Sequence, residues 1–278
     1  MSATTKYLES KFQDILPPSE ERSEVQSTID TVRDHVGAAF PIAELHPSGS
    51  WAKRTMLAGR KEADLVMFMA EAPDSHTLDT MASHLGKLEN LSSSYTSHKA
   101  VQLTFDNGVS IDVLPVAEHG VTPDGPSIPK KLRYARFGPD HVRWYKDNVR
   151  GKRHQTVCLL KHARDCNSRQ LGGLFSFAIE VMAAEMNLTG NLAHHFKGAL
   201  QLLADSWLMD GDDVRHLSDP VVQGRNLLEN LSEFECQRIA RCANDLVRSI
   251  QADTWSQVFP GARVLPGPAS NLGGRTLA

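Results

Sequence analysis

Apolar residues recur at helical spacing shortly after the start of the chain. Val25, Ile29 and Val32 are separated by steps of four and three residues, which places them on one side of a helix. Ser19 suits the N-cap of this helix, and Gly37 is expected to end it. The pattern therefore predicts a first helix over about 19–36.

Three short apolar segments follow and have the patterns of strands. Residues 63–69 form a compact apolar run around one carboxylate, which is typical of a buried strand. Residues 101–105 and 109–114 alternate apolar and polar positions, as half-buried strands do. Asn107-Gly108 lies between these two segments and favours a type I′ turn, which needs positive φ at both residues. We therefore predict an antiparallel hairpin.

The second half of the chain has mostly helical patterns. Residues 117–139 are rich in glycine and proline and are predicted to form a long loop. Helices are predicted over 140–149, 155–166, 172–187, 192–209 and 232–252, the last with a capping box from Ser232 to Glu235. The sequence predicts an α+β protein with a mixed domain at 1–140, a helical domain at 141–260 and a flexible tail at 261–278.

Composition excludes several classes of protein. The 278 residues are 41% apolar and 23% charged, as in a soluble globular protein. No run approaches the roughly 18 apolar residues of a membrane span, and the N-terminus lacks the apolar core of a secretory signal. The four cysteines have neither disulfide-framework nor zinc-site spacing. We expect a cytoplasmic protein with no membrane partner.

Charge is distributed unevenly along the chain. The net charge is -3, but residues 130–164 hold 11 lysines and arginines and only two acids. A local excess of +9 in an acidic protein indicates either a site for an anion or a solvated helix face. Charge alone leaves both interpretations open.

Three carboxylates stand out against their apolar surroundings. Glu62 and Asp64 are two residues apart at the start of a predicted strand, so both side chains lie on one face of the sheet. Asp112 lies in the middle of another strand, where a carboxylate is costly unless it is compensated. A single such acid could simply face solvent or a salt bridge. Three of them favour a divalent cation, because Mg²⁺ takes oxygen ligands and leaves places for substrate phosphates.

A glycine-serine turn precedes the carboxylates. Gly49 allows close approach of the backbone to a phosphate, and Ser50 offers a hydroxyl where free N–H groups collect anions. Thr55 follows, and six residues separate it from Glu62. A Gly-Ser dipeptide alone is uninformative. The succession of Gly-Ser, Thr55, Glu-x-Asp and a further aspartate in a separate strand is a specific signal.

These residues, with Ile111-Asp112-Val-Leu-Pro115, resemble the DNA-polymerase-β-like nucleotidyltransferase superfamily. Within it, the chain is most similar to the branch that holds 2′-5′-oligoadenylate synthetases, cyclic GMP-AMP synthase and bacterial CD-NTases. The resemblance implies a nucleotidyltransferase core with a mixed sheet and flanking helices, followed by an all-helical C-terminal bundle. It extends over about residues 45–260.

The resemblance also implies roles for individual residues. Glu62, Asp64 and Asp112 would be the catalytic residues and would hold two Mg²⁺ or Mn²⁺ ions. The nucleotide-binding residues would be Gly49, Ser50, Thr55, Lys161, Ser176, Asp219 and Asn226. The first acid is Glu62 where many relatives have aspartate, and Arg54 stands where glycine often precedes the threonine. No His/Cys cluster resembles the zinc insertion of animal cyclic GMP-AMP synthases, so no zinc is expected.

Three functions follow from the resemblance. The first is an enzyme that joins NTPs, ATP among them, into a short linear or cyclic oligonucleotide second messenger in antiviral or antiphage defence. The second is an enzyme that adds nucleotides to an RNA end. The third is a non-catalytic dimerisation module like the DZF domain, which Ala63-Asp64-Leu-Val66 and His141-Val-Arg143-Trp144-Tyr145 also resemble. Retention of all three acids favours an enzyme over the third.

Candidate partners follow from the same features. The basic band at 130–164 is a candidate surface for an activating nucleic acid, and the tail at 261–278 is a candidate segment for an effector or a conjugating enzyme. The sequence does not determine the base specificity, the type of phosphodiester linkage or the activating ligand.

Overall fold

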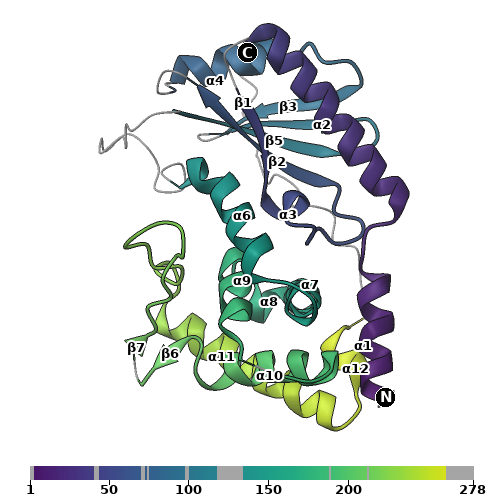
Figure 1. Cartoon of the computed structure of the whole chain (residues 1–278), viewed down its shortest axis with the longest axis vertical. Helices are drawn as coiled ribbons and strands as arrows, with labels where there is room; N and C mark the ends of the chain where they lie inside the picture. Colours follow the sequence, from purple (N-terminus) through teal and green to yellow (C-terminus); the bar gives the residue numbers. More distant parts are fainter. Residues whose placement is uncertain are drawn as a thin grey trace, which may run out of the picture.

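The structure, a computed structural model, describes residues 3–40, 44–69, 73, 75–97, 100–117, 134–187, 189–211 and 213–260. It has two halves, a sheet half at the top of Figure 1 and a helical half below it. The loop predicted at 117–139 lies for the most part outside the described residues, and the tail predicted at 261–278 lies wholly outside them.

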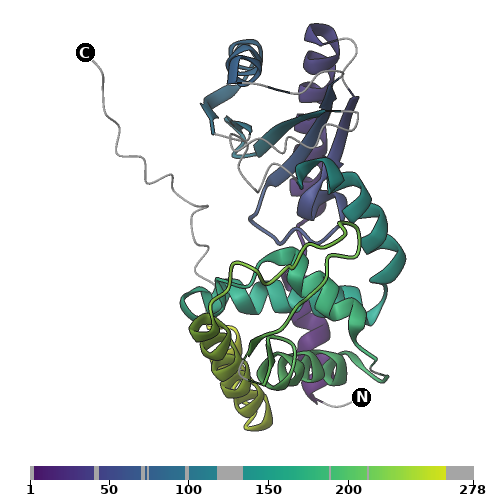
Figure 2. The same ribbon diagram turned by 90° about the vertical axis from the view of Figure 1, so that its left-hand side faces the viewer.

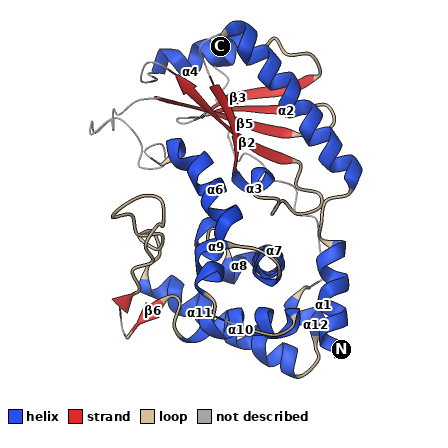
Figure 3. Cartoon of the chain, in the orientation of Figure 1, coloured by secondary structure: helices blue, strands red, loops and turns tan. Residues whose placement is uncertain are grey.

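The sheet half is built on five strands. They are β1 (Glu44–Ser48), β2 (Glu62–Met69), β3 (Leu91–Thr96), β4 (Val101–Phe105) and β5 (Ser110–Ala117). Their spatial order is β1-β2-β5-β4-β3, and the sheet is drawn in red in Figure 3. The central pair, β2 and β5, is parallel, and all other neighbours are antiparallel. The mixed sheet predicted from sequence is therefore confirmed, and β1 and β3 are additions to it.

One face of this sheet is covered by helices α2 (Ser19–Ala39) and α4 (Ser75–Leu85) (Figure 2). Val25, Ile29 and Val32 of α2 are fully buried against Leu65 and Ile111 of the strands. The helical spacing in the sequence thus identified the buried side of α2. The helix continues past Gly37 to Ala39, because one glycine in a helix costs only about 1 kcal/mol relative to alanine.

The predicted hairpin between β4 and β5 is confirmed, but its turn type was wrong. Gly108 has φ +77°, whereas Asn107 does not adopt positive φ. The Gly108 N–H donates to the Phe105 carbonyl at 2.8 Å, and the Phe105 N–H donates to the Val109 carbonyl at 2.9 Å. The loop therefore has three residues, so only its last position needs the left-handed conformation.

The helical half contains most of the remaining helices. They are α6 (Gly138–Asn148), α7 (Lys152–Cys166), α8 (Ser168–Leu171), α9 (Ser176–Glu185), α10 (Leu192–Asp205), α11 (Glu233–Gln251) and α12 (Trp255–Val258). The capping box of Ser232 and Glu235 is present at the start of α11. A two-stranded ribbon, β6 (Met209–Asp210) and β7 (Asp213–Val214), lies between α10 and α11.

Several helix boundaries differ from the sequence predictions; the helix predicted over 155–166, for example, begins already at Lys152. The helix predicted over 172–187 begins only at Ser176, and the one predicted over 192–209 ends at Asp205. Ser19 is the first helical residue of α2 rather than its N-cap, which is Pro18. Proline suits this position because the helix start does not need its missing N–H.

Helix α1 (Ala3–Asp14) was not predicted, and it packs far from the sheet. Leu8 and Phe12 are buried in the core of the helical half, against residues of α7 and α10. Tyr7 stacks on Trp255 of α12, with ring centroids 4.6 Å apart. The chain therefore begins in the helical half and crosses to the sheet half at α2.

Among the described residues, no helix combines the length and the apolar character that crossing a membrane requires.

Candidate active site

Two aspartates lie side by side on the face of the sheet opposite to α2 and α4. Asp64 on β2 and Asp112 on β5 are direct partners in the parallel register. Their neighbours Ala63 and Ile111 are buried against the helices on the other face, so alternation turns both aspartates away from those helices. Glu62, two residues before Asp64, lies on the same face at the start of β2. The three carboxylates predicted from sequence thus occupy one face.

Gly49 fits closely against Asp64. It begins the short helix α3 (Gly49–Ala52), directly after Ser48 of β1, which is the register partner of Asp64. Its φ is +63°, and a Cβ at this position would lie 1.8 Å from Oδ2 of Asp64. Only glycine meets both conditions, because any side chain would displace the carboxylate. This contact explains why glycine stands in the turn before the carboxylates.

We expect Gly49→Ala to lower the rate of the reaction proposed below by about 10²-fold, since displacement of a reacting group by about 1 Å can cost that much. Gly108→Ala is the matched control. Gly108 has φ +77°, but nothing lies within 4 Å of the added Cβ. Steady-state kinetics of both variants measure the difference. Equal rates for the two variants would show that the contact with Asp64 is unimportant.

Asp112 is held by a neighbour that the sequence did not indicate. Gln102 on β4 is its antiparallel register partner. The Gln102 Nε2 donates to Oδ1 of Asp112 at 3.0 Å and to Oδ2 at 3.2 Å. The amide therefore orients this carboxylate in the plane of the sheet face.

The chemistry of the three acids fits magnesium in part. Carboxylate oxygens are its preferred protein ligands, and Asp64 and Asp112 come from adjacent strands, as a shared site requires. Glu62 fits such a site less well than the two aspartates do. Its side chain is 51% exposed and lies 3.9 Å from Arg60, and within the described ranges no three His, Cys, Asp or Glu side chains are grouped for metal binding. The exposure of Glu62 leaves its side chain free to rotate toward the two aspartates.

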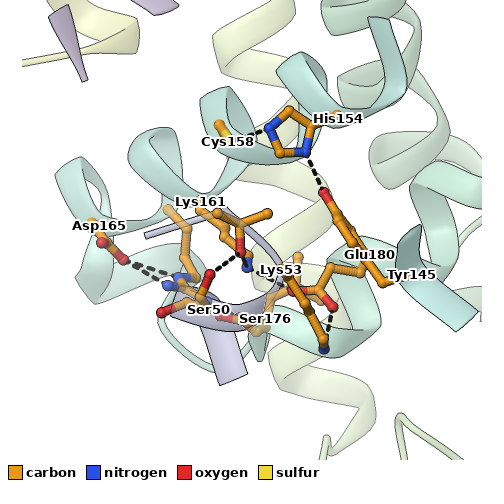
Figure 4. Close-up of polar contacts among 12 residues, drawn as sticks. Ser50, Lys53, Tyr145, His154, Cys158, Lys161, Asp165, Ser176 and Glu180 are labelled. Carbon is orange, nitrogen blue, oxygen red and sulfur yellow. Dashed lines mark hydrogen bonds and ion pairs between the residues drawn. The ribbon is translucent and has the colours of Figure 1, made fainter. Parts of the chain in front are cut away.

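Beneath the Gly-Ser turn lies a buried group of charges (Figure 4). Lys161 of α7 donates to the Thr55 hydroxyl at 2.7 Å and to Glu180 of α9 at 2.6 Å. Lys53, at the end of α3, donates to the other Glu180 oxygen at 2.7 Å. Lys53, Lys161 and Glu180 are 7%, 3% and 1% exposed. We call these three residues the lysine–glutamate triad; it joins the turn of the sheet half to two helices of the other half.

The triad changes the ionisation of its members. Burial lowers the pKa of Lys161, and Glu180 partly opposes this effect. Burial alone would raise the pKa of Glu180, but Lys161 and Lys53 outweigh it and hold that pKa below its usual value. Two ammonium groups share one carboxylate, so the triad carries more positive than negative charge directly under Thr55.

Ser176 belongs to a second polar network. It begins α9, and its hydroxyl accepts a hydrogen bond from Arg164 of α7 at 3.1 Å. Arg164 also pairs with Asp165 at 2.9 Å, and Arg60 from the sheet half reaches the same carboxylate at 3.4 Å. Because Ser176 accepts from Arg164, its own hydroxyl proton remains available for an acceptor such as a phosphate oxygen.

Asp219 and Asn226 stabilise the loop before α11. Asp219 accepts from His141 Nε2 at 3.1 Å and from the Val221 and Val222 N–H groups. Burial would raise the pKa of Asp219, but these hydrogen bonds hold it below its usual value. The Asn226 side chain accepts from two backbone N–H groups of its own loop. In this structure both residues make structural contacts, and their role toward a nucleotide stays a prediction.

The sequence analysis missed Lys53, Gln102 and Arg164 as members of the site. Lys53 contacts Glu180, 127 residues away, and Gln102 contacts Asp112, 10 residues away on another strand. Neither separation is a local spacing that a sequence pattern indicates. The alternation in β4 placed Gln102 on the polar face, and this was the single signal that could have indicated it.

No protein-family model matches the sequence, and no curated protein matches it either. Solved structures do match its fold. The E. coli MS115-1 CdnC, in complex with HORMA-deltaN, aligns with a TM-score of 0.68 at 21% identity, over 92% of this chain and 96% of that chain. The Bradyrhizobium diazoefficiens CD-NTase CdnG in complex with GTP aligns with a TM-score of 0.73 at 14% identity, over 92% and 94%.

A third match is the Cid1 poly(U) polymerase with bound Mg and 3′-dATP. It aligns with a TM-score of 0.68 at 15% identity, over 89% of this chain and 94% of that one. All three alignments span both halves, and their low identities establish the fold. The chain therefore has the fold of the polymerase-β-like nucleotidyltransferases, shared with CD-NTases such as CdnC and CdnG and with the Cid1 polymerase.

Proposed function

We propose that the protein is a Mg²⁺-dependent nucleotidyltransferase that joins NTPs into a short oligonucleotide. The observation that carries this proposal is the pairing of Asp64 with Asp112 in register on parallel strands, with the Gly49 backbone packed against Asp64. A non-catalytic module has no need of two adjacent carboxylates or of a glycine fitted against one of them.

The proposed reaction is attack of a ribose hydroxyl on the α-phosphorus of a bound NTP. The new bond forms between the hydroxyl oxygen and the α-phosphorus, while the bond from that phosphorus to the bridging oxygen breaks and pyrophosphate leaves. Asp112 accepts the proton of the attacking hydroxyl, and Gln102 keeps its carboxylate oriented during the transfer. Positioning and electrostatic stabilisation supply most of the rate.

Glu62, Asp64 and Asp112 would hold the magnesium. When bound, Mg²⁺ lowers the pKa of the attacking hydroxyl and stabilises negative charge on the phosphates. Asp64 would be the central ligand of the three, because it lies between Glu62 on its own strand and Asp112 on the next.

The triphosphate would lie over the Gly-Ser turn. Ser50 and Ser176 offer hydroxyl groups from the two halves, and Thr55 lies in the same turn above the lysine–glutamate triad. The excess positive charge of the triad attracts the phosphates from below. Lys161 contacts a phosphate directly only if it exchanges its bond to Thr55 or Glu180.

ATP is the substrate we propose first, since the resemblance includes oligoadenylate synthetases and CdnC is also known in a complex with ATP. Addition of nucleotides to an RNA end is the second candidate, favoured by the fold shared with the Cid1 poly(U) polymerase. The proposed role of the product as a messenger in defence depends on the first candidate, the joining of NTPs.

The basic band remains a candidate surface for an activating nucleic acid. Residues 130–133 lie outside the described part of the chain. On α6 the exposed Arg143 is paired with Asp140 at 3.1 Å, which reduces its net charge. Lys161 is buried in the triad and does not contribute to such a surface.

The experiment is incubation of the purified chain with labelled ATP, GTP, CTP and UTP in Mg²⁺ or Mn²⁺. Each reaction is run with and without double-stranded RNA and with a single-stranded RNA primer, and products are separated after phosphatase treatment. Short phosphatase-resistant products that disappear with EDTA support the proposal. Labelled primer supports the second candidate. Absence of product under every condition would contradict both and favour the non-catalytic module.

A further inference from the structure

A continuous row of polar side chains crosses the whole sheet through the two aspartates. The registers of the four strand pairs align Ser48 of β1 with Asp64, Asp64 with Asp112, Asp112 with Gln102, and Gln102 with Tyr95 of β3. Cross-strand partners share a face of a sheet, so all five side chains lie on the face of the carboxylates.

The opposite face confirms the orientation of Tyr95. Ser94, its neighbour on β3, is the partner of Leu103, which is buried in the core beneath α2 and α4. The Ser94 hydroxyl also lies 3.8 Å from the position of a Cβ on Gly86, just after α4. Since successive residues of a strand alternate, Tyr95 points away from these helices.

Tyr95 is one of three large, well-exposed hydrophobic residues in the described chain, at 46% exposure. Of the other two, Tyr7 stacks on Trp255, and Phe234 lies at the start of α11 in the helical half. No ring contact among the described residues involves Tyr95. Among these three residues, Tyr95 is thus the one that lies in line with the carboxylates.

Its distance from the carboxylates suits a nucleoside. Tyr95 is two strands from Asp112, about 10 Å at the usual spacing of strands. A nucleotide whose ribose hydroxyl is at Asp112 extends its base over a comparable distance. Gln102 lies between, with its amide already bonded to Asp112.

We propose that Tyr95 is the stacking platform for the base of the acceptor nucleotide, with Gln102 as the positioning residue between that base and Asp112. This inference rests on the proposed nucleotidyltransferase activity. Every base presents a π-face, so an aromatic platform accepts different bases and holds purines more strongly than pyrimidines. The acceptor base is thereby selected by stacking at the β3 edge, separately from the donor base.

The test uses the full chain with saturating ATP as donor and the dinucleotides ApA and UpU as acceptor probes. Tyr95→Ala should raise the KM for ApA about tenfold or more and reduce the preference for ApA over UpU. The KM for ATP as donor, measured with saturating ApA, and the melting temperature should not change. Tyr95→Phe keeps the ring and should behave as the unmodified protein does.

Two further variants separate the roles. Phe234→Ala removes the other exposed aromatic residue and should leave every constant unchanged. Gln102→Glu keeps the shape but loses the donor to Asp112, so kcat should fall about tenfold while the KM for ATP is retained. Binding of ApA in the presence of α,β-methylene-ATP, measured by calorimetry, gives the same comparison without turnover.

The outcomes distinguish the inference from its premise. If the unmodified protein forms product and Tyr95→Ala binds ApA as tightly as it does, the platform is refuted and the proposed function stands. If the unmodified protein neither binds NTPs nor forms product, the proposed function fails and the platform fails with it. A selective loss of ApA affinity in Tyr95→Ala, restored in Tyr95→Phe, supports both.

Discussion

Asp64→Asn will lower nucleotidyl transfer by at least about 10³-fold, and the protein will remain folded. The substitution keeps the size of the side chain against Gly49 and removes the charge that would bind magnesium. Asp64 is next to both other carboxylates, with Glu62 two residues before it on β2 and Asp112 opposite it on β5, so its loss disturbs the whole metal site. The measurement is product formation from labelled ATP at several Mg²⁺ concentrations, with circular dichroism to monitor the fold.

Glu89→Gln is a suitable control for this variant. It removes one negative charge from an exposed position in the same half, outside the face of the carboxylates. Its rate should match that of the unmodified protein. Activity of Asp64→Asn within tenfold of the unmodified protein would exclude Asp64 from the reaction and would contradict the proposed metal site.

Glu180→Gln will destabilise the protein by about 3–5 kcal/mol, which is the cost of leaving buried charges without their partner. Glu180 is 1% exposed, and its two oxygens accept from Lys161 and Lys53 at 2.6 and 2.7 Å. The amide cannot neutralise either ammonium group. Urea unfolding followed by tryptophan fluorescence gives the free energy of unfolding of each variant.

Glu185→Gln is the matched control on the same helix. Glu185 pairs with Arg215 at 3.0 Å, but its side chain is 40% exposed, so removing its charge should cost less than about 1 kcal/mol. Equal losses in the two variants would mean that the triad contributes no more to stability than a surface ion pair.

The same triad makes stability depend on pH. The pKa of Glu180 is lower in the folded protein than its usual value of 4.5, so its contribution is present above that value. As the pH falls below 4.5, the unfolded chain takes up the proton first and this stability is lost. The free energy of unfolding should therefore decrease less steeply with acid in Glu180→Gln than in the unmodified protein.

Local sequence patterns predicted the parts of the fold that depend on local periodicity. The buried side of α2 followed from the spacing of Val25, Ile29 and Val32, and the pairing of β4 with β5 followed from alternation around Asn107-Gly108. Glu62 and Asp64 could be placed on one face because they are two residues apart in one strand, whereas the register that pairs Asp64 with Asp112 needed the structure. Strand β3 was missed because Ser92, Ser93 and Ser94 carry no apolar signal.

The environment of the site could not be predicted in the same way. In the triad, Glu180 contacts Lys161, 19 positions away, and Lys53, 127 positions away. These contacts form only because α3, α7 and α9 pack together. The sequence resemblance assigned Lys161 to the triphosphate, but it gave no indication that the ammonium group is buried against Thr55 and Glu180. Such contacts are decided by tertiary packing rather than by spacing.

The packing of α1 has a consequence for the order of folding. Leu8 and Phe12 are buried only when α7 and α10 are in place, and these helices are made after the whole sheet half. During synthesis, α1 leaves the ribosome before these helices and must therefore wait for them before its apolar side is covered. The helical half therefore closes last, when α1 from before the sheet packs against helices from after it.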